Sequence, residues 1–180
     1  IHFNRYFLRC CNGFHLNGDY KQLGLTALHY RPFTLEGNFA AAQAVNEMLL
    51  QSWGGKISVF PAVPKAWAEA VFHDLRAEGA FLVSARREGG KTAWVHVKSL
   101  AGEPCRVRPG MDGEVKATVA GKPVRLKSLG DGEYELPLAK GQEALLYTGE
   151  TAPRTVVEPE PADPAACNFW GVKAQAGKAP

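Results

Sequence analysis

The chain has 180 residues, 46% of them hydrophobic and 22% charged, with a formal net charge of +3 at pH 7. This is enough apolar sequence to bury one core or two small ones. Basic and acidic residues are mixed along the chain, and no apolar run approaches the ~20 residues of a membrane span, so we expect neither nucleic acid nor a membrane as a partner.

A strong helix is predicted near the end of residues 1–55. From Phe39 to Ser52 the apolar residues recur at helical spacing, and the Gly54-Gly55 pair is typical of a helix end. Asn38 is well placed as the N-cap, since its side-chain oxygen can accept a backbone N–H. Two Asn-Gly pairs upstream favour turns.

The carboxylate of Glu36 is predicted on a glycine-containing turn immediately before this helix. A charge at the mouth of a buried helix costs free energy unless it is paired or used in chemistry. Arg31 is close enough in sequence to pair with it. The alternative is a solvated carboxylate that interacts with the helix dipole, which is worth under ~1 kcal/mol.

Residues 56–150 are predicted to form an antiparallel β domain, with an extended, proline-broken connector at 57–67. Apolar residues alternate with polar ones on both sides of Gly89-Gly90, which indicates a β-hairpin. Turn signals about every ten residues favour a small sandwich rather than βαβ units. The apolar residues of the predicted strands are Phe81, Val83, Ala85, Ala93, Val95, Val97, Val115, Ala117, Val119, Val124 and Leu126, and further strands are predicted at Glu133–Leu138 and Ala144–Tyr147.

Residues 151–180 differ in composition, with five prolines among Ala, Glu and Val. This pattern predicts a linker or a loosely packed tail. The sequence contains no internal repeat.

A first motif and three further ones follow one another over residues 31–83. The first is Pro32-Phe33-Thr34-Leu35-Glu36-Gly37-Asn38-Phe39-Ala40, followed by Glu47-Met48-Leu49-Leu50-Gln51-Ser52. Then come Pro61-Ala62-Val63-Pro64-Lys65-Ala66-Trp67 and Asp74-Leu75-Arg76-Ala77-Glu78-Gly79-Ala80-Phe81. Together they resemble glycoside hydrolase family 95, the inverting α-L-fucosidases, in which the first motif reads Pro-Phe-Gln-Ile-Asp-Gly-Asn-Phe-Gly and carries a catalytic carboxylate.

The resemblance implies an α+β fold. Residues 1–55 would be the terminal helices of an (α/α)6 barrel, and 56–150 the antiparallel β-sandwich-like domain that packs against it. The activity implied is cleavage of an α-linked terminal sugar with inversion, and the substrate an oligosaccharide or glycoconjugate. Glu36 would be the catalytic base or the carboxylate that orients it, with Asn38, His15 and Thr34 as substrate contacts. The implied parent enzyme uses no cofactor and is secreted or periplasmic.

The sequence departs from the family pattern at the chemistry itself. Glu36 stands where the family has Asp, Thr34 where it has Gln, and Ala40 where it has Gly. An inverting enzyme needs its two carboxyl groups about 6.5–9.5 Å apart, and a side chain longer by one methylene can meet that spacing only from a shifted backbone. The sugar is therefore open between fucose and an L-galactose-like residue.

The family's general acid, a glutamate, lies upstream of the first motif. The chain also begins at Ile1 with no leader. We therefore expect a C-terminal piece of a longer enzyme, inactive by itself, whose partner is the missing upstream barrel. Helix 39–52 would then be under-packed here, while 56–148 would form the stable unit.

Other polar residues have more ordinary interpretations. His15 and His29 could reach the same cleft as Glu36, but a single histidine is more often a structural hydrogen-bonder. Asp19 in its turn usually bonds its own backbone. Trp53 and Trp67 are more often core or domain-interface residues than sugar platforms. No metal site is expected, because neither the His/Asp/Glu residues nor the cysteines, Cys10, Cys11, Cys105 and Cys167, have ligand spacing.

A second function remains open, from a different class. The β domain could be a non-catalytic sandwich that binds glycan or supports a partner domain. This hypothesis depends on exposed aromatic residues at strand positions, namely Trp94, Tyr134 and Tyr147.

Overall fold

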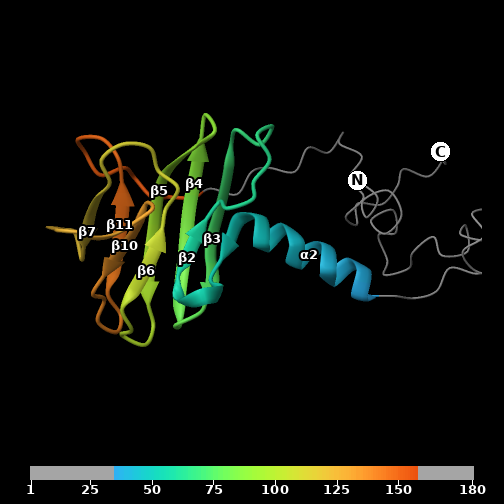
Figure 1. The fold of residues 1–180 in the computed structure, drawn as a ribbon, viewed down its shortest axis with the longest axis horizontal. Helices are drawn as coiled ribbons and strands as arrows, with labels where there is room; N and C mark the ends of the chain where they lie inside the picture. The colour runs from blue at the N-terminus through green and yellow to red at the C-terminus, as the bar shows by residue number, and fades with distance from the viewer. Residues whose placement is uncertain (1–34, 158–180) are drawn as a thin grey trace, which may run out of the picture. The chain divides into compact units, whose positions relative to one another are not determined.

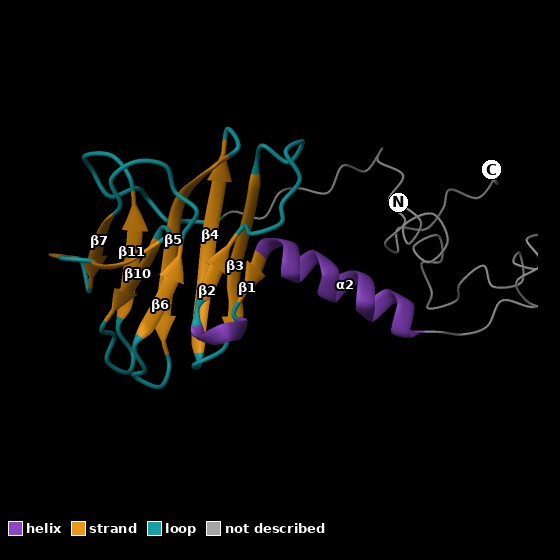
Figure 2. Ribbon diagram, in the orientation of Figure 1, coloured by secondary structure: helices purple, strands orange, loops and turns teal. Residues whose placement is uncertain are grey.

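The computed structural model describes residues 35–157, and for 35–38 and 41 the backbone alone. One α-helix, α2, precedes strands that form two sheets (Figures 1 and 2). Of the described residues, 46–157 belong to one compact unit and 35–45 to another. The elements are α2 Leu35–Leu49, β1 Leu50–Gln51, η2 Trp53–Gly55, β2 Ile57–Val59, β3 Ala70–Ala77, β4 Phe81–Glu88, β5 Lys91–Ser99, β6 Cys105–Arg108, β7 Lys116–Val119, β8 Lys122–Val124, β9 Lys127–Gly130, β10 Glu133–Leu136 and β11 Glu143–Tyr147.

Helix α2 has different bounds from those predicted. It includes Glu36 and Asn38, so the expectation that Glu36 lies on a turn before the helix and that Asn38 caps it was wrong. The alanine-rich run that follows has high helix propensity, which outweighs the cost of about 1 kcal/mol for Gly37. The helix therefore extends past the predicted cap.

The helix also ends earlier than predicted, at Leu49 rather than near Gly54-Gly55. Its last carbonyls find partners outside the helix. Phe60 N–H donates to the Leu49 carbonyl at 2.8 Å and Ala62 N–H to the Met48 carbonyl at 3.3 Å. The side-chain amide of Gln51 donates to the Glu47 carbonyl at 3.0 Å. Because these bonds satisfy the C-terminal carbonyls, the chain can leave the helix directly into β1.

The first sheet has five strands in the order β1-β2-β6-β10-β9. Its pairs are antiparallel except for β2 and β6, which run parallel with Ile57 opposite Val107. The prediction of an antiparallel domain was wrong for this pair. The two strands can run parallel because the chain passes through β3, β4 and β5 between them, and a parallel pair needs such a long crossover.

The second sheet has six strands in the order β3-β4-β5-β11-β7-β8, and every pair in it is antiparallel. The predicted hairpin is present as β4 and β5, joined at Gly89-Gly90 with φ values of 54° and 80°. Positive φ at both central residues is what a two-residue hairpin turn of type I′ requires. Pro123 lies in the edge strand β8, where its missing N–H disrupts no ladder.

The inner faces of the two sheets share one hydrophobic core, so the architecture is a β-sandwich. The predicted inward residues Phe81, Val83, Ala85, Val95, Val97 and Ala117 all belong to this core. Ala93 does not, because a register shift between Arg86 and Arg87 leaves it out of the alternation. The described chain is thus mostly β-sheet with one helix.

Candidate functional site

The sequence-predicted site residues fall at or beyond the edge of the described chain. His15, Thr34 and the neighbouring Arg31 lie outside the described residues. Glu36 and Asn38 lie in the first turns of α2, where the structure describes backbone only. Both residues therefore lie on a helix rather than on a turn.

The described side chains of α2 are largely exposed over its first turns. Phe39 is 65% exposed and Val45 is 37% exposed. Exposure decreases toward the end of the helix, where residues 47–49 are half-buried. Within residues 35–157, no layer therefore covers the apolar side chains in the part of the helix that follows the Glu36 motif.

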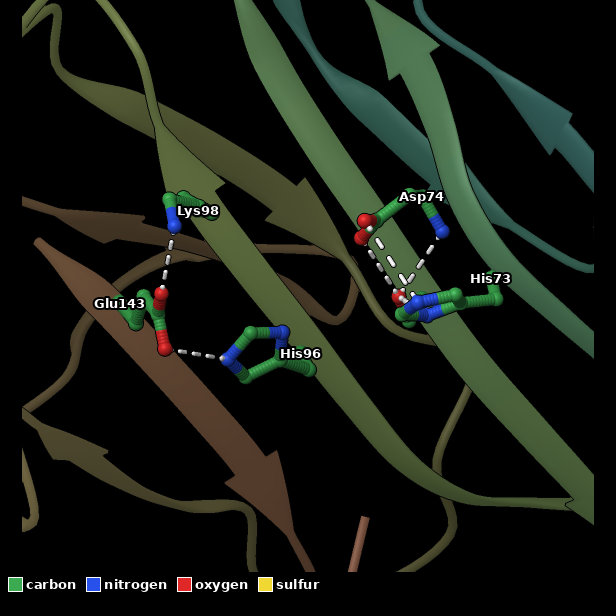
Figure 3. A network of polar contacts seen from close by, with 6 residues as sticks. His73, Asp74, His96, Lys98 and Glu143 are labelled. Carbon is green, nitrogen blue, oxygen red and sulfur yellow. Dashed lines mark hydrogen bonds and ion pairs between the residues drawn. The ribbon is translucent and has the colours of Figure 1, made fainter. Parts of the chain in front are cut away.

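A cluster of Ser84, His73 and Asp74 has the composition of a hydrolase triad (Figure 3). Its geometry indicates a structural role. Ser84 Oγ accepts from the Asp74 N–H at 3.0 Å, donates to Asp74 Oδ1 at 3.2 Å and lies 3.0 Å from His73 Nδ1. The residue is only 3% exposed, so its hydroxyl is fully used and closed to a substrate. These bonds hold the β3 bulge, where Asp74 has a φ of 52°.

A second polar group lies on the same face of the sheet, centred on Glu143 (Figure 3). Its carboxylate contacts Lys98 Nζ at 3.0 Å and His96 Nε2 at 3.3 Å. The hydrogen bond from Lys98 is the main cause that lowers the pKa of Glu143, and the charge of His96 adds to it. This group is a half-exposed ion-pair network that ties β5 to β11.

A cleft of about 370 Å³ opens on the first sheet, beside η2. It is lined by Gln51, Trp53, Lys56, Ser58, Val59, Phe60, Pro61, Arg108 and Gly110. The sequence favoured Trp53 and Trp67 as core or domain-interface residues; they are 66% and 41% exposed, so neither belongs to the core of the sandwich. The parallel pairing of β2 and β6 brings Ser58 opposite Arg108, and no local sequence signal predicts that pairing.

The aromatic residues proposed as an exposed glycan platform are not exposed. Trp94 is 3% exposed and Tyr147 is 8% exposed, and Tyr134 packs against the core. That part of the alternative hypothesis was wrong. Trp94 and Tyr147 are register partners on adjacent strands, so their rings can cover one another. Over residues 35–157 no three His, Cys, Asp or Glu side chains group as metal ligands, and α2 is neither long nor apolar enough to cross a membrane.

Comparison with known families identifies the β domain. The sequence model described as "Glycoside hydrolase family 95, C-terminal domain" matches residues 51–146, more than half of the 180 residues. The chain belongs to glycoside hydrolase family 95. The matched span begins at β1 and ends within β11, so the family's C-terminal domain coincides with the β-sandwich.

A distant similarity to a solved structure accompanies this match. A structure titled as a family 39 glycoside hydrolase from the gut symbiont Bacteroides cellulosilyticus WH2 is similar at 16% identity, with a TM-score of 0.31. The similarity covers 44% of this chain and 17% of that chain. No curated protein matches the sequence.

Proposed function

We propose that this chain is the C-terminal part of a family 95 glycoside hydrolase that removes an α-linked terminal sugar, fucose or L-galactose-like, with inversion. The observation that carries the proposal is contiguity. The family's C-terminal domain begins at residue 51, and the helix that carries the Glu36 motif ends two residues earlier, at Leu49. The helix that carries the catalytic motif is therefore followed directly by the first strand of the sandwich, with no intervening linker.

In this proposal α2 is a helix of the catalytic (α/α)6 barrel. The exposure of Phe39 and Val45 supports this role, because the barrel helices upstream would cover those side chains. The β-sandwich would supply the fixed end of the helix, through the bonds that Phe60 and Ala62 donate to its last carbonyls. The 180 residues would be inactive without the upstream part, which in the family provides the general acid.

Glu36 is assigned the role of base, or of the carboxylate that orients the base. Its backbone position in the first turn of α2 supports this, because the N-terminal end of a helix stabilises negative charge by about 0.3–1 kcal/mol. A base must be deprotonated at working pH to take a proton from water. Asn38, Thr34 and His15 are assigned to substrate contact, as the resemblance implies.

The test is Glu36→Gln in the complete enzyme, assayed with nitrophenyl α-L-fucoside and nitrophenyl α-L-galactoside. Loss of a catalytic carboxylate should lower kcat by roughly 10²–10⁴-fold, while KM and the unfolding midpoint stay close to the parent's. The matched control is Glu47→Gln, which changes a carboxylate on the same helix and should leave kcat nearly unchanged. Near-normal turnover by the Glu36 variant would refute the assignment.

A further inference from the structure

The cleft beside η2 combines an exposed aromatic ring with charged and polar side chains. Trp53 is its aromatic wall and is 66% exposed. The two glycines that follow have φ values of 74°, and a Cβ added at either would meet no atom within 4 Å. Trp53 is therefore followed by a tight turn whose two glycines have open space beside them.

The lining of the cleft also includes a cation with unused bonding capacity. Arg108 Nε is buried and has no hydrogen-bond partner among the described residues. An unsatisfied buried donor on a guanidinium is more costly than the same gap in a neutral group. No described acidic side chain pairs with Arg108, whereas the neighbouring Lys56 has Glu133 at 3.8 Å. The local charge of the cleft is therefore positive.

Neutral hydrogen-bonding groups also line the cleft. Ser58 is opposite Arg108 in the sheet register and opposite Gln51 on the other side, so the three side chains form one row across β1, β2 and β6. The side-chain amide N–H of Gln51 donates to the Glu47 carbonyl. This bond fixes the Gln51 side chain and therefore the direction of its amide oxygen. The row offers a hydroxyl and an amide oxygen next to a guanidinium.

We propose that this cleft binds a sugar unit that bears a carboxylate, as a uronic acid does. A pyranose ring has an apolar face of C–H groups that stacks on an indole ring, and a rim of hydroxyl groups that bonds serine and glutamine. A guanidinium binds a carboxylate through two parallel N–H bonds. The volume of about 370 Å³ lies at the small end of ligand sites and fits one or two sugar rings.

The proposed site shares no residue with the Glu36 motif and does not depend on the proposed hydrolysis. It would hold an acidic glycan on the β-sandwich through Trp53 and Arg108, and not through Trp94, Tyr134 and Tyr147. Its failure would leave the catalytic proposal untouched, because none of its residues belongs to the Glu36 motif.

The test is calorimetric titration of the full 180-residue chain with oligogalacturonate, and in parallel with a neutral galactose oligosaccharide of equal length. We expect saturable binding of the acidic probe and at least tenfold weaker binding of the neutral one. Trp53→Ala and Arg108→Gln should each weaken acidic-probe binding about tenfold or more, which corresponds to about 1.4 kcal/mol. Trp53→Phe keeps a stacking ring and should lose less than Trp53→Ala.

Matched controls are Trp67→Ala and Arg125→Gln, which remove the same residue types at exposed positions outside the cleft. Both should bind the acidic probe as the parent does, and circular dichroism verifies that every variant is folded. Equal affinity for the acidic and neutral probes, or an Arg108→Gln variant that binds normally, would overturn the assignment to an acidic sugar. Absence of saturable binding at millimolar probe, or equal losses in the controls, would overturn the site itself.

Discussion

Truncation of Leu146 tests the sandwich core most severely. Leu146 is fully buried on β11, a strand bonded on both sides, with Val95 opposite on β5 and Ala117 opposite on β7. Leu→Ala in a core costs about 2.7–5 kcal/mol, and the cost is highest where the surroundings cannot collapse into the cavity. Because two ladders hold this backbone, we expect Leu146→Ala to cost about 3–5 kcal/mol.

The measurement is urea unfolding of the full chain, followed by intrinsic fluorescence and far-UV circular dichroism. The matched control is Leu129→Ala, which removes the same atoms from a residue 40% exposed on β9 and should cost under about 1 kcal/mol. Equal losses in the two variants would mean that β11 is not a central strand, and the strand order of the six-stranded sheet would be wrong.

Three further predictions concern single positions. Gly79→Ala should destabilise the chain more than Gly141→Ala. The two glycines have nearly the same φ, 81° and 82°, but a Cβ at Gly79 would meet the buried Phe81 ring at 2.7 Å, while a Cβ at Gly141 would meet no atom within 4 Å. Similar urea midpoints for the two variants would contradict this prediction. Burial raises the pKa of the Cys105 thiol to about 12. Site-resolved alkylation at pH 8 should therefore leave Cys105 unmodified in the folded chain and modify it in denaturant. Rapid labelling of Cys105 in the folded chain would show that the core opens there. The pKa of the Glu143 carboxyl is lowered by Lys98 and His96, so its contribution to stability is present above the ordinary glutamate pKa of about 4.3 and is lost as the pH falls through its lower folded value. Glu143→Gln should therefore flatten the fall in urea midpoint between about pH 5 and pH 3, by a small amount because the carboxylate is 46% exposed, and an unchanged slope would exclude this contribution.

The strands with strict alternation were predictable from sequence. The hairpin at Gly89-Gly90 was predicted because five inward apolar residues and two glycines all indicate the same register, and β7, β10 and β11 followed from the same signals. Strand β3 was missed because the bulge at His73-Asp74 breaks its period of two. Strand β9 carries no alternation, since all four of its residues are exposed.

The candidate site was predictable only in part. The order of the motifs indicated family 95, and the match of residues 51–146 to its C-terminal domain confirms the family. The prediction that Glu36 lies on a turn was wrong, because helix propensity in the alanine run extends α2 past the expected Asn38 cap. The cleft could not be predicted from the sequence, since Trp53 and Arg108 come to line one cleft only through the parallel pairing of β2 with β6.

In the proposed arrangement the β-sandwich is stable by itself, while α2 belongs to a catalytic domain completed by upstream sequence. Amide hydrogen exchange of the 180-residue chain and of the complete enzyme measures this residue by residue. We expect slow exchange along β4, β5 and β11 in both proteins, with α2 fast in the 180-residue chain and slow in the complete enzyme. Slow exchange of α2 in the 180-residue chain, or fast exchange of α2 in both proteins, would contradict it.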